Sequence, residues 1–169
     1  APAIDLRLAE VAVAALGRAA GHTRRMRCLL PLSTGSVREA GTMAAIVRLL
    51  DAQGIPGDAL GLQIAEDTAV QLGAQTAALC AAARDAGCRI VLGEFGGGFA
   101  SFSHLHAIRP QGVKISRSLT RDIATSRSAL ALIRAIEEIA RDLDIETIAE
   151  GIDDLPMAKL IEDIGITYA

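Results

Sequence analysis

Five polar residues recur along this sequence, each at the point where a short apolar run stops. They are Ser33, Glu66, Glu94, Ser116 and Glu150. Their hydroxyl and carboxylate side chains mark where chemistry would take place. If the apolar runs are strands of a (β/α) barrel, all five residues lie on the face where such barrels build their active sites. The spacing therefore predicts a site at the carboxyl ends of the strands.

A glycine-rich loop between the apolar runs 90–92 and 113–115 is the second feature that could do chemistry. Glycine lets the backbone adopt a positive φ or approach a ligand closely, and three of the chain's four aromatic residues lie in this loop. The glycines and aromatic residues are Gly96, Gly97, Gly98, Phe95, Phe99 and Phe102. Two interpretations stay open: a ligand-contacting loop with stacking rings, or a flexible connection anchored by core phenylalanines.

Alternating strands and helices would position these residues. Apolar periodicity predicts helices at residues 5–20, 43–50, 68–86 and 126–143, with short ones after the glycines and around residues 157–161. Strands are predicted at residues 25–32, 60–65, 90–92, 113–115 and 146–149, followed by a last apolar run at 164–168. This alternation is typical of an α/β fold with a mostly parallel sheet, and the placement of the polar residues favours a barrel.

Two of the predicted helices have an assignable apolar face. On the first helix this face carries Leu8, Val11, Ala12, Ala15 and Leu16. On the long later helix it carries Leu132, Ile136, Ile139 and Leu143, and either Ser126 or Ser128 can cap the helix N-terminus.

The composition is that of one soluble globular domain. With 169 residues, 51% of them hydrophobic and 22% charged, the chain can bury a core of useful size, and no low-complexity linker divides it. The formal net charge of −3 argues against a nucleic-acid-binding surface, although Arg24, Arg25 and Arg27 cluster. We therefore predict no nucleic-acid partner.

The sequence carries no recognisable targeting segment. No apolar run reaches the roughly 18 residues expected of a membrane span, and Asp5, Arg7 and Glu10 interrupt any signal-peptide pattern. The predicted location is the cytoplasm, with no membrane contact by this chain. The three cysteines are odd in number and lack paired metal spacing, so we expect reduced core or near-core thiols. They are Cys28, Cys80 and Cys88.

Five motifs, in order, resemble those of the EAL-domain family, the TIM-like barrels that hydrolyse the bacterial messenger cyclic di-GMP. Residues 29–33 (LLPLS) and 62–66 (LQIAE) resemble the family's V-N-L-S and L-E-I-T-E. Residues 92–98 (LGEFGGG) are similar to L-D-D-F-G-T-G, 113–116 (VKIS) to a strand ending K-I-D, and 148–153 (IAEGID) to A-E-G-V-E. The resemblance implies a TIM-like (β/α) barrel of the EAL type.

The resemblance also implies that parts of the family domain lie outside this chain. The first strands, with the E-A-L motif itself, would precede Ala1, and a final Q-G-Y-type strand would follow Ala169. We therefore expect residues 1–169 to be a single degenerate EAL domain that forms an incomplete barrel, as part of a longer protein. Its apolar edges would be covered by the missing segments or by a partner.

The departures from the family pattern fall on the metal ligands that the resemblance implies. Family enzymes hold two Mg²⁺ or Mn²⁺ ions with a ring of carboxylates and one Asn, and two-metal hydrolysis needs both ions. The implied ligand positions hold Pro31 for the Asn, Gln63 for a Glu, Gly93-Glu94 for the D-D pair and Ser116 for an Asp. The family-matching remnants are Glu66, Glu94, Lys114, Glu150 and Asp153. We expect a catalytically inactive site with no bound metal or other cofactor.

The predicted function is that of an inactive EAL-like regulatory domain in bacterial cyclic di-GMP signalling, acting as nucleotide receptor, protein-interaction module or both. The alternatives are a pure protein-docking module without nucleotide binding, and an active phosphodiesterase. The expected partners are cyclic di-GMP and either other domains of a longer signalling protein or a partner protein. The residues predicted to bind ligand are Glu94, Phe95, Gly96, Gly97, Gly98, Phe99, Lys114 and Glu150. Outside the motif, Lys114 would also fit a lysine that snorkels from an edge strand.

Replacing Phe99 by Ala is expected to weaken cyclic di-GMP binding, because this ring follows the glycines and is the one least committed to the strand end. Stacking on an aromatic ring is worth about 1–3 kcal/mol per base, so the dissociation constant should rise roughly tenfold or more. Calorimetric titration of the wild type and of Phe99→Ala in EDTA measures this change. Equal affinities would show that Phe99 does not stack on the nucleotide.

Overall fold

The computed structural model describes residues 2–19, 26–97 and 103–169, and the chain divides into two compact units, Ala1–Ile90 and Val91–Ala169. The first unit holds α1 (Pro2–Ala19), β1 (Cys28–Leu32), α2 (Thr34–Arg38), α3 (Thr42–Ala52), the 3₁₀ turn η1 (Gly57–Ala59), β2 (Leu60–Ala65), α4 (Glu66–Gln71) and α5 (Gly73–Asp85). Strand β3 (Arg89–Phe95) crosses the boundary between the units. The second unit continues with α6 (Ser103–Ile108), β4 (Gly112–Ile115), α7 (Arg117–Thr120), α8 (Arg127–Asp142), β5 (Glu146–Ala149) and α9 (Leu155–Ile164).

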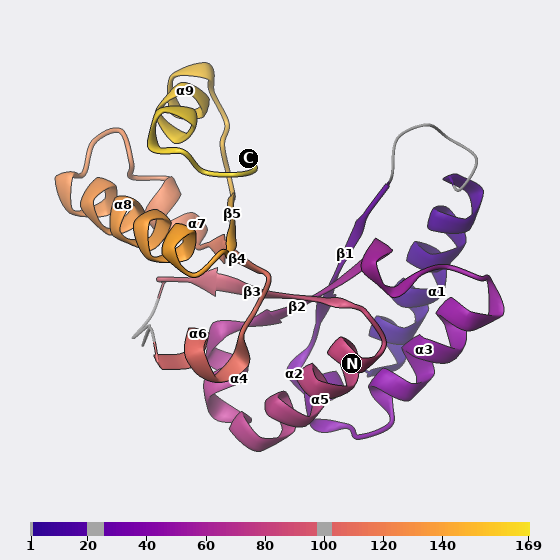
Figure 1. The fold of residues 1–169 in the computed structure, drawn as a ribbon. Coiled ribbons are helices and arrows are strands. Elements are labelled where there is room, and N and C mark those ends of the chain that lie inside the picture. Colours follow the sequence, from indigo (N-terminus) through magenta and orange to yellow (C-terminus); the bar gives the residue numbers. More distant parts are fainter. Residues whose placement is uncertain (1, 20–25, 98–102) are drawn as a thin grey trace. The chain divides into compact units, whose positions relative to one another are not determined.

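The strands form an α/β sheet in sequence order, β1-β2-β3-β4-β5 (Figure 1). The pairs β1/β2, β3/β4 and β4/β5 are parallel, as expected when helices connect successive strands. Over the described residues the sheet is an open one of five strands, which confirms an incomplete barrel. The last apolar run, residues 164–168, adds only an isolated bridge between Tyr168 and Ile148 of β5.

The core of the first unit lies between β1, β2 and the helices that contact them. Leu30, Leu60, Leu62 and Ile64 are almost fully buried in the two strands. Helix α1 packs against both α3 and β1 (Figure 1). Burying each such side chain stabilises the fold by about 1.5–3 kcal/mol, so the position of each strand end follows from this packing.

The core of the second unit is built in the same way from β4, β5 and α8. Val113 and Ile115 of β4 and Ile133 of α8 are fully buried. Helix α8 begins after Ser126, whose side chain accepts a hydrogen bond from the Ala129 N–H at 3.2 Å. Of the two serines that the sequence allowed, Ser126 is therefore the N-cap.

Both predicted helix faces were only partly right: Ala12 and Leu16 of α1 and Ile136 of α8 are buried, but the other predicted residues are not. Helix α1 buries Asp5, Ala9, Ala12, Val13 and Leu16, whereas Leu8 and Val11 are about half exposed. Helix α8 buries Ala129, Ile133, Ile136, Glu137 and Ala140, whereas Leu132 and Leu143 are about half exposed. In each helix the buried face includes a carboxylate with a hydrogen-bond partner on another element, so apolar spacing alone did not identify it.

The single helix predicted at residues 68–86 is also wrong, because α4 ends at Gln71 and α5 begins at Gly73. Leu72 between them has φ −113° and ψ 40°, outside the helical region, and its side chain is buried. The short helices α2 and α7 were not predicted either, because four or five residues carry too little periodicity to recognise.

The three cysteines are free thiols, as predicted, with Cys80 and Cys88 buried and Cys28 half-buried. Burial raises the pKa of Cys80 and of Cys88 to about 11. In the part of the chain that the structure describes, no helix combines the length and the apolar character needed to cross a membrane.

Gly57 allows the turn before β2 to lie against the end of α5. A Cβ atom at this position would lie 2.0 Å from the carbonyl oxygen of Ala86. Gly57→Ala should therefore destabilise the fold by at least about 2 kcal/mol, because backbone must move to relieve the overlap. Urea unfolding followed by circular dichroism measures the change.

The matched control for this substitution is Gly73→Ala at the first residue of α5, where a Cβ would meet nothing within 4 Å. Because alanine has the higher helix propensity, this variant should be unchanged or up to about 1 kcal/mol more stable. Equal stability of the two variants would contradict the close approach at Gly57.

Candidate functional site

The second unit brings together Lys114 and Glu150, two of the predicted site residues. Lys114 lies in β4, and Glu150 is the first residue after β5, the neighbouring parallel strand. The Lys114 ammonium forms an ion pair with the Glu150 carboxylate, and the two side chains are 24% and 22% exposed. Because both charges are largely removed from water, the pair depends on close geometry.

Glu94 and Ser116 form a second contact in this unit, between the ends of β3 and β4. The Ser116 hydroxyl donates a hydrogen bond to a Glu94 carboxylate oxygen at 3.1 Å. Ser116 is buried and also caps α7, since its hydroxyl accepts from the Ser118 N–H at 3.3 Å. Glu94 has a positive φ of 56° where the pairing of β3 with β4 is irregular, so the strand turns this residue out to an exposed position.

The first two glycines of the loop, Gly96 and Gly97, are closely surrounded by side chains of the second unit. Gly96 has φ +80°, a conformation that favours glycine. At Gly97 a Cβ would lie 2.6 Å from the Ser116 hydroxyl oxygen. Phe95 is fully buried. The predicted residues Gly98 and Phe99, and Phe102, lie outside the described residues, and the ligand contacts predicted for this loop stay predictions.

In the first unit, the end of β1 is held by a buried carboxylate that sequence reasoning did not place near the site. Asp5 of α1 accepts hydrogen bonds from the Ser33 N–H at 2.7 Å and from the Ser36 hydroxyl at 2.6 Å. The Ser33 hydroxyl in turn accepts from the Ser36 N–H at 3.3 Å and caps α2. A signal for this role was present, since an Asp on an otherwise apolar helix face needs a partner.

The other predicted residues of the first unit lie in β1, in β2 or directly after β2. Pro31 of β1 and Gln63 of β2 are register partners in the parallel pair. Glu66 is the first residue of α4, directly after β2, and is only 4% exposed. The sequence thus placed Ser33, Glu66, Ser116 and Glu150 correctly at strand ends, while Glu94 lies inside β3 because that strand continues to Phe95.

The acidic, histidine and cysteine side chains are the groups of this chain that could bind a metal ion. Within residues 2–19, 26–97 and 103–169, no group of three or more such side chains could hold a metal ion. The two predicted ligand-binding carboxylates of the second unit have partners within the chain, Glu94 the Ser116 hydroxyl and Glu150 the Lys114 ammonium. The donor set at these strand ends thus includes the Ser116 hydroxyl and the Lys114 ammonium beside the two carboxylates.

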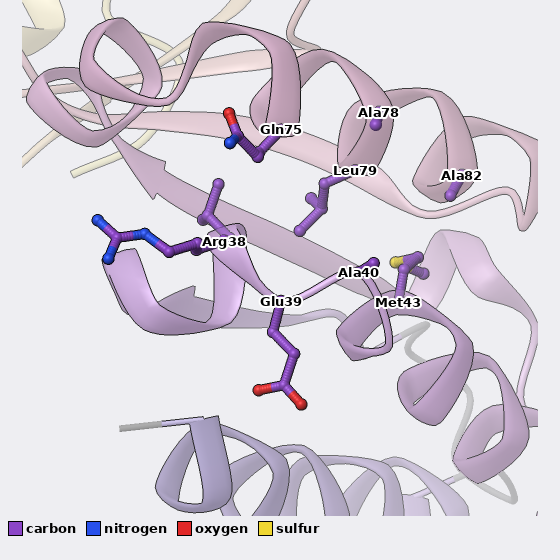
Figure 2. Close-up of a pocket in the computed structure, with 9 residues that line it drawn as sticks. Arg38, Glu39, Ala40, Met43, Gln75, Ala78, Leu79 and Ala82 are labelled. Atoms are coloured by element: carbon purple, nitrogen blue, oxygen red, sulfur yellow. The ribbon is translucent and has the colours of Figure 1, made fainter.

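A cleft of about 160 Å³ lies elsewhere in the first unit, between the α2–α3 turn and α5 (Figure 2). Met43 and Leu79 lie in it together with alanines of both elements, and Arg38, Glu39 and Gln75 supply its polar atoms. Among the described residues that line this cleft, none belongs to the predicted site. It is therefore separate from the ends of the strands.

Comparisons with known proteins match all of residues 1–169 to the family described as EAL domain. Protein sll1895 of Synechocystis is 30% identical over 139 residues, which are 82% of this chain and 20% of that protein. The cyclic di-GMP phosphodiesterase PdeB of Shewanella oneidensis is 28% identical over 138 residues, 82% of this chain and 16% of that protein. The chain thus spans a fifth or less of these two relatives.

A solved structure, the EAL domain of Xanthomonas citri FimX in complex with c-diGMP, is similar to this chain with a TM-score of 0.90. It is 28% identical, and the match covers 98% of this chain and 65% of that domain. The PaMucR phosphodiesterase in its c-di-GMP complex has the same TM-score at 20% identity, and this likeness shows the fold alone.

Asp5→Asn should lower the stability of the fold by about 1–2 kcal/mol at neutral pH, through loss of charge-assisted hydrogen bonds. Burial would raise the pKa of this carboxyl, but the hydrogen bonds from Ser33 and Ser36 outweigh it and hold the pKa below its ordinary value of 3.8. A lowered pKa stabilises the fold at pH above 3.8, and this contribution is lost as pH falls further, through the folded-state pKa.

The difference between wild type and Asp5→Asn should therefore be constant from neutral pH down to about pH 5 and shrink below the ordinary aspartate pKa. Urea unfolding at a series of pH values measures it. Asp51→Asn, at an exposed position of α3, is the matched control and should change little at any pH. A difference that persists undiminished under strongly acidic conditions would contradict the charged state of Asp5.

Proposed function

Because this chain belongs to the EAL domain family, we propose that it is a regulatory domain of cyclic di-GMP signalling that binds the nucleotide without hydrolysing it. The observation that carries the proposal is the Lys114–Glu150 ion pair at the ends of β4 and β5. In it the carboxylate of Glu150 is neutralised by an ammonium of the chain itself. A domain of this kind needs no cation to keep that carboxylate stable.

The donor chemistry supports the absence of hydrolysis. Two divalent cations need several negatively charged oxygen ligands, and metal-assisted hydrolysis of this type needs both cations. At the positions where the sequence resemblance implies ligands, Pro31 and Gly93 have no side-chain oxygen, and Gln63 and Ser116 carry no charge. These residues do not fit a pair of divalent cations.

The Lys114–Glu150 pair is better suited to bind a phosphate than a cation. An ammonium has three donors, so Lys114 can keep Glu150 as a partner and still donate to a phosphate oxygen. Pairing also reduces the repulsion that the Glu150 carboxylate would exert on a phosphate. The Glu94 carboxylate likewise has a partner, the Ser116 hydroxyl. The FimX EAL domain, which is 28% identical, has c-diGMP bound in its solved structure, and the proposal extends that class of ligand to this chain.

Two alternatives remain as outcomes of the test. A relative that is 28% identical, PdeB, is a cyclic di-GMP phosphodiesterase, which favours retained catalysis. A module that only docks a partner protein would bind no nucleotide at all. The partner in that case would be another domain of a longer signalling protein or a separate protein.

Cyclic di-GMP should bind this chain in EDTA, with an affinity that added Mg²⁺ does not increase and with no linear dinucleotide formed. Lys114→Ala should weaken binding roughly tenfold or more, through loss of a charge-assisted hydrogen bond. Lys159→Ala is the matched control, because Lys159 is the only other lysine of the sequence and is exposed on α9. Calorimetry measures the affinity, and chromatography of the nucleotide measures the product.

Restoring one ligand by Ser116→Asp should not restore hydrolysis, since the other positions would still lack charged oxygens. Binding that requires Mg²⁺ would refute metal-free recognition. Product formation above the level of Lys114→Ala would refute inactivity, and no binding in either buffer would favour the protein-docking alternative.

A further inference from the structure

The short helix α7 contacts the residue that follows β5, 30 positions further along the chain. Thr120, the last residue of α7, is fully buried, and its hydroxyl donates a hydrogen bond to the carbonyl oxygen of Glu150 at 2.5 Å. The last register pair of β4 and β5 is Ile115 with Ala149, so Glu150 lies just past the strand ladder. The Thr120 hydroxyl therefore extends the hydrogen bonding of the sheet by one residue.

The first residue of α7 contacts the next part of the same turn. The Arg117 side chain lies directly over Gly151, where a Cβ would be 2.8 Å from the Arg117 Nε atom. Gly151 has φ +66°, which favours glycine. Beyond it, the Arg117 guanidinium reaches the Asp153 carboxylate at 3.4 Å, an exposed pair that by itself contributes little. Both ends of α7 thus restrict the backbone around Glu150.

A fixed backbone at Glu150 matters because its side chain forms the half-buried pair with Lys114. A partly desolvated ion pair is favourable only with close geometry, and a carboxylate on a mobile turn would lose that geometry. Since β5 ends at Ala149, the strand ladder alone does not hold Glu150. The buried Thr120 hydroxyl of α7 donates a hydrogen bond to the Glu150 backbone and so holds it from another element.

We propose that Thr120 is a positioning residue, whose hydroxyl holds the Glu150 backbone so that the carboxylate stays paired with Lys114 and sets the affinity for a cyclic dinucleotide phosphate. The effect on affinity rests on the proposed function. The effect on the Lys114–Glu150 pair does not. Without the hydroxyl, the turn relaxes, Lys114 loses its orientation and Glu150 faces the phosphate unpaired.

The sequence has two lysines, Lys114 and Lys159. The test follows their ¹³Cε resonances by NMR of lysine-labelled protein, with Lys159→Arg assigning the two signals. Thr120→Val keeps the volume of the side chain and removes the hydroxyl. In this variant the Lys114 resonance should move toward its position in Glu150→Gln, while that of Lys159 stays in place. Thr120→Ser keeps a hydroxyl and should restore the wild-type position. Thr120→Ala removes the hydroxyl with a smaller side chain and replaces the valine variant if that one does not fold.

Titration with cyclic di-GMP in EDTA is the second readout. Thr120→Val should bind about fivefold more weakly than wild type, as expected for the loss of one hydrogen bond, and Thr120→Ser should bind like wild type. A Lys114 resonance that stays at the wild-type position in Thr120→Val would overturn the proposal. If the wild type binds cyclic di-GMP, equal affinities of wild type and Thr120→Val would overturn it too. If the wild type does not bind, the proposed function fails, while the lysine resonances still decide the role of Thr120.

Discussion

The half-buried ion pair between Lys114 and Glu150 is the interaction on which the polar end of the second unit depends. Lys114 lies in β4 between Val113 and Ile115, both fully buried, so its ammonium needs a partner close to the strand. A lysine held in such a position without a counter-charge would be costly to desolvate. The neighbouring strand β5 is followed directly by Glu150, which supplies that charge. Thr120 of α7 holds the backbone of Glu150 by a hydrogen bond.

In both units, a side chain of a helix forms a hydrogen bond with a backbone group at the end of a strand. Where a parallel strand stops, its last peptide groups lose their partners in the ladder and need others. After β1 the partner of the Ser33 N–H is the Asp5 carboxylate of α1, and after β5 the partner of the Glu150 carbonyl is the Thr120 hydroxyl of α7. Buried polar side chains therefore fix the loops at the ends of the strands, the place where α/β folds of this kind build their sites.

The errors in the helix faces have one physical cause. Both α1 and α8 carry apolar residues on more than one side, so periodicity allowed more than one buried face. The buried faces are those that contain Asp5 and Glu137, because each carboxylate has a hydrogen-bond partner on another element. The partners of Asp5 are Ser33 and Ser36, and that of Glu137 is Thr147 at 2.6 Å. Burying a carboxylate is tolerated only with such hydrogen bonds, and these bonds span sequence separations that no local pattern reveals.

The sequence by itself determined the alternation of strands and helices, the polar residues at the strand ends and the chemical identity of the donor set. These features depend only on side-chain type and on spacing over a few residues, so they can be recognised without the folded structure. Only the tertiary structure decided which helix faces are buried, that Lys114 pairs with Glu150, and that Asp5 and Thr120 hold strand ends. Such contacts join residues 10 or more positions apart, most of them about 30 apart. They depend on how strands and helices pack, a property of the folded chain that neighbours in sequence do not encode.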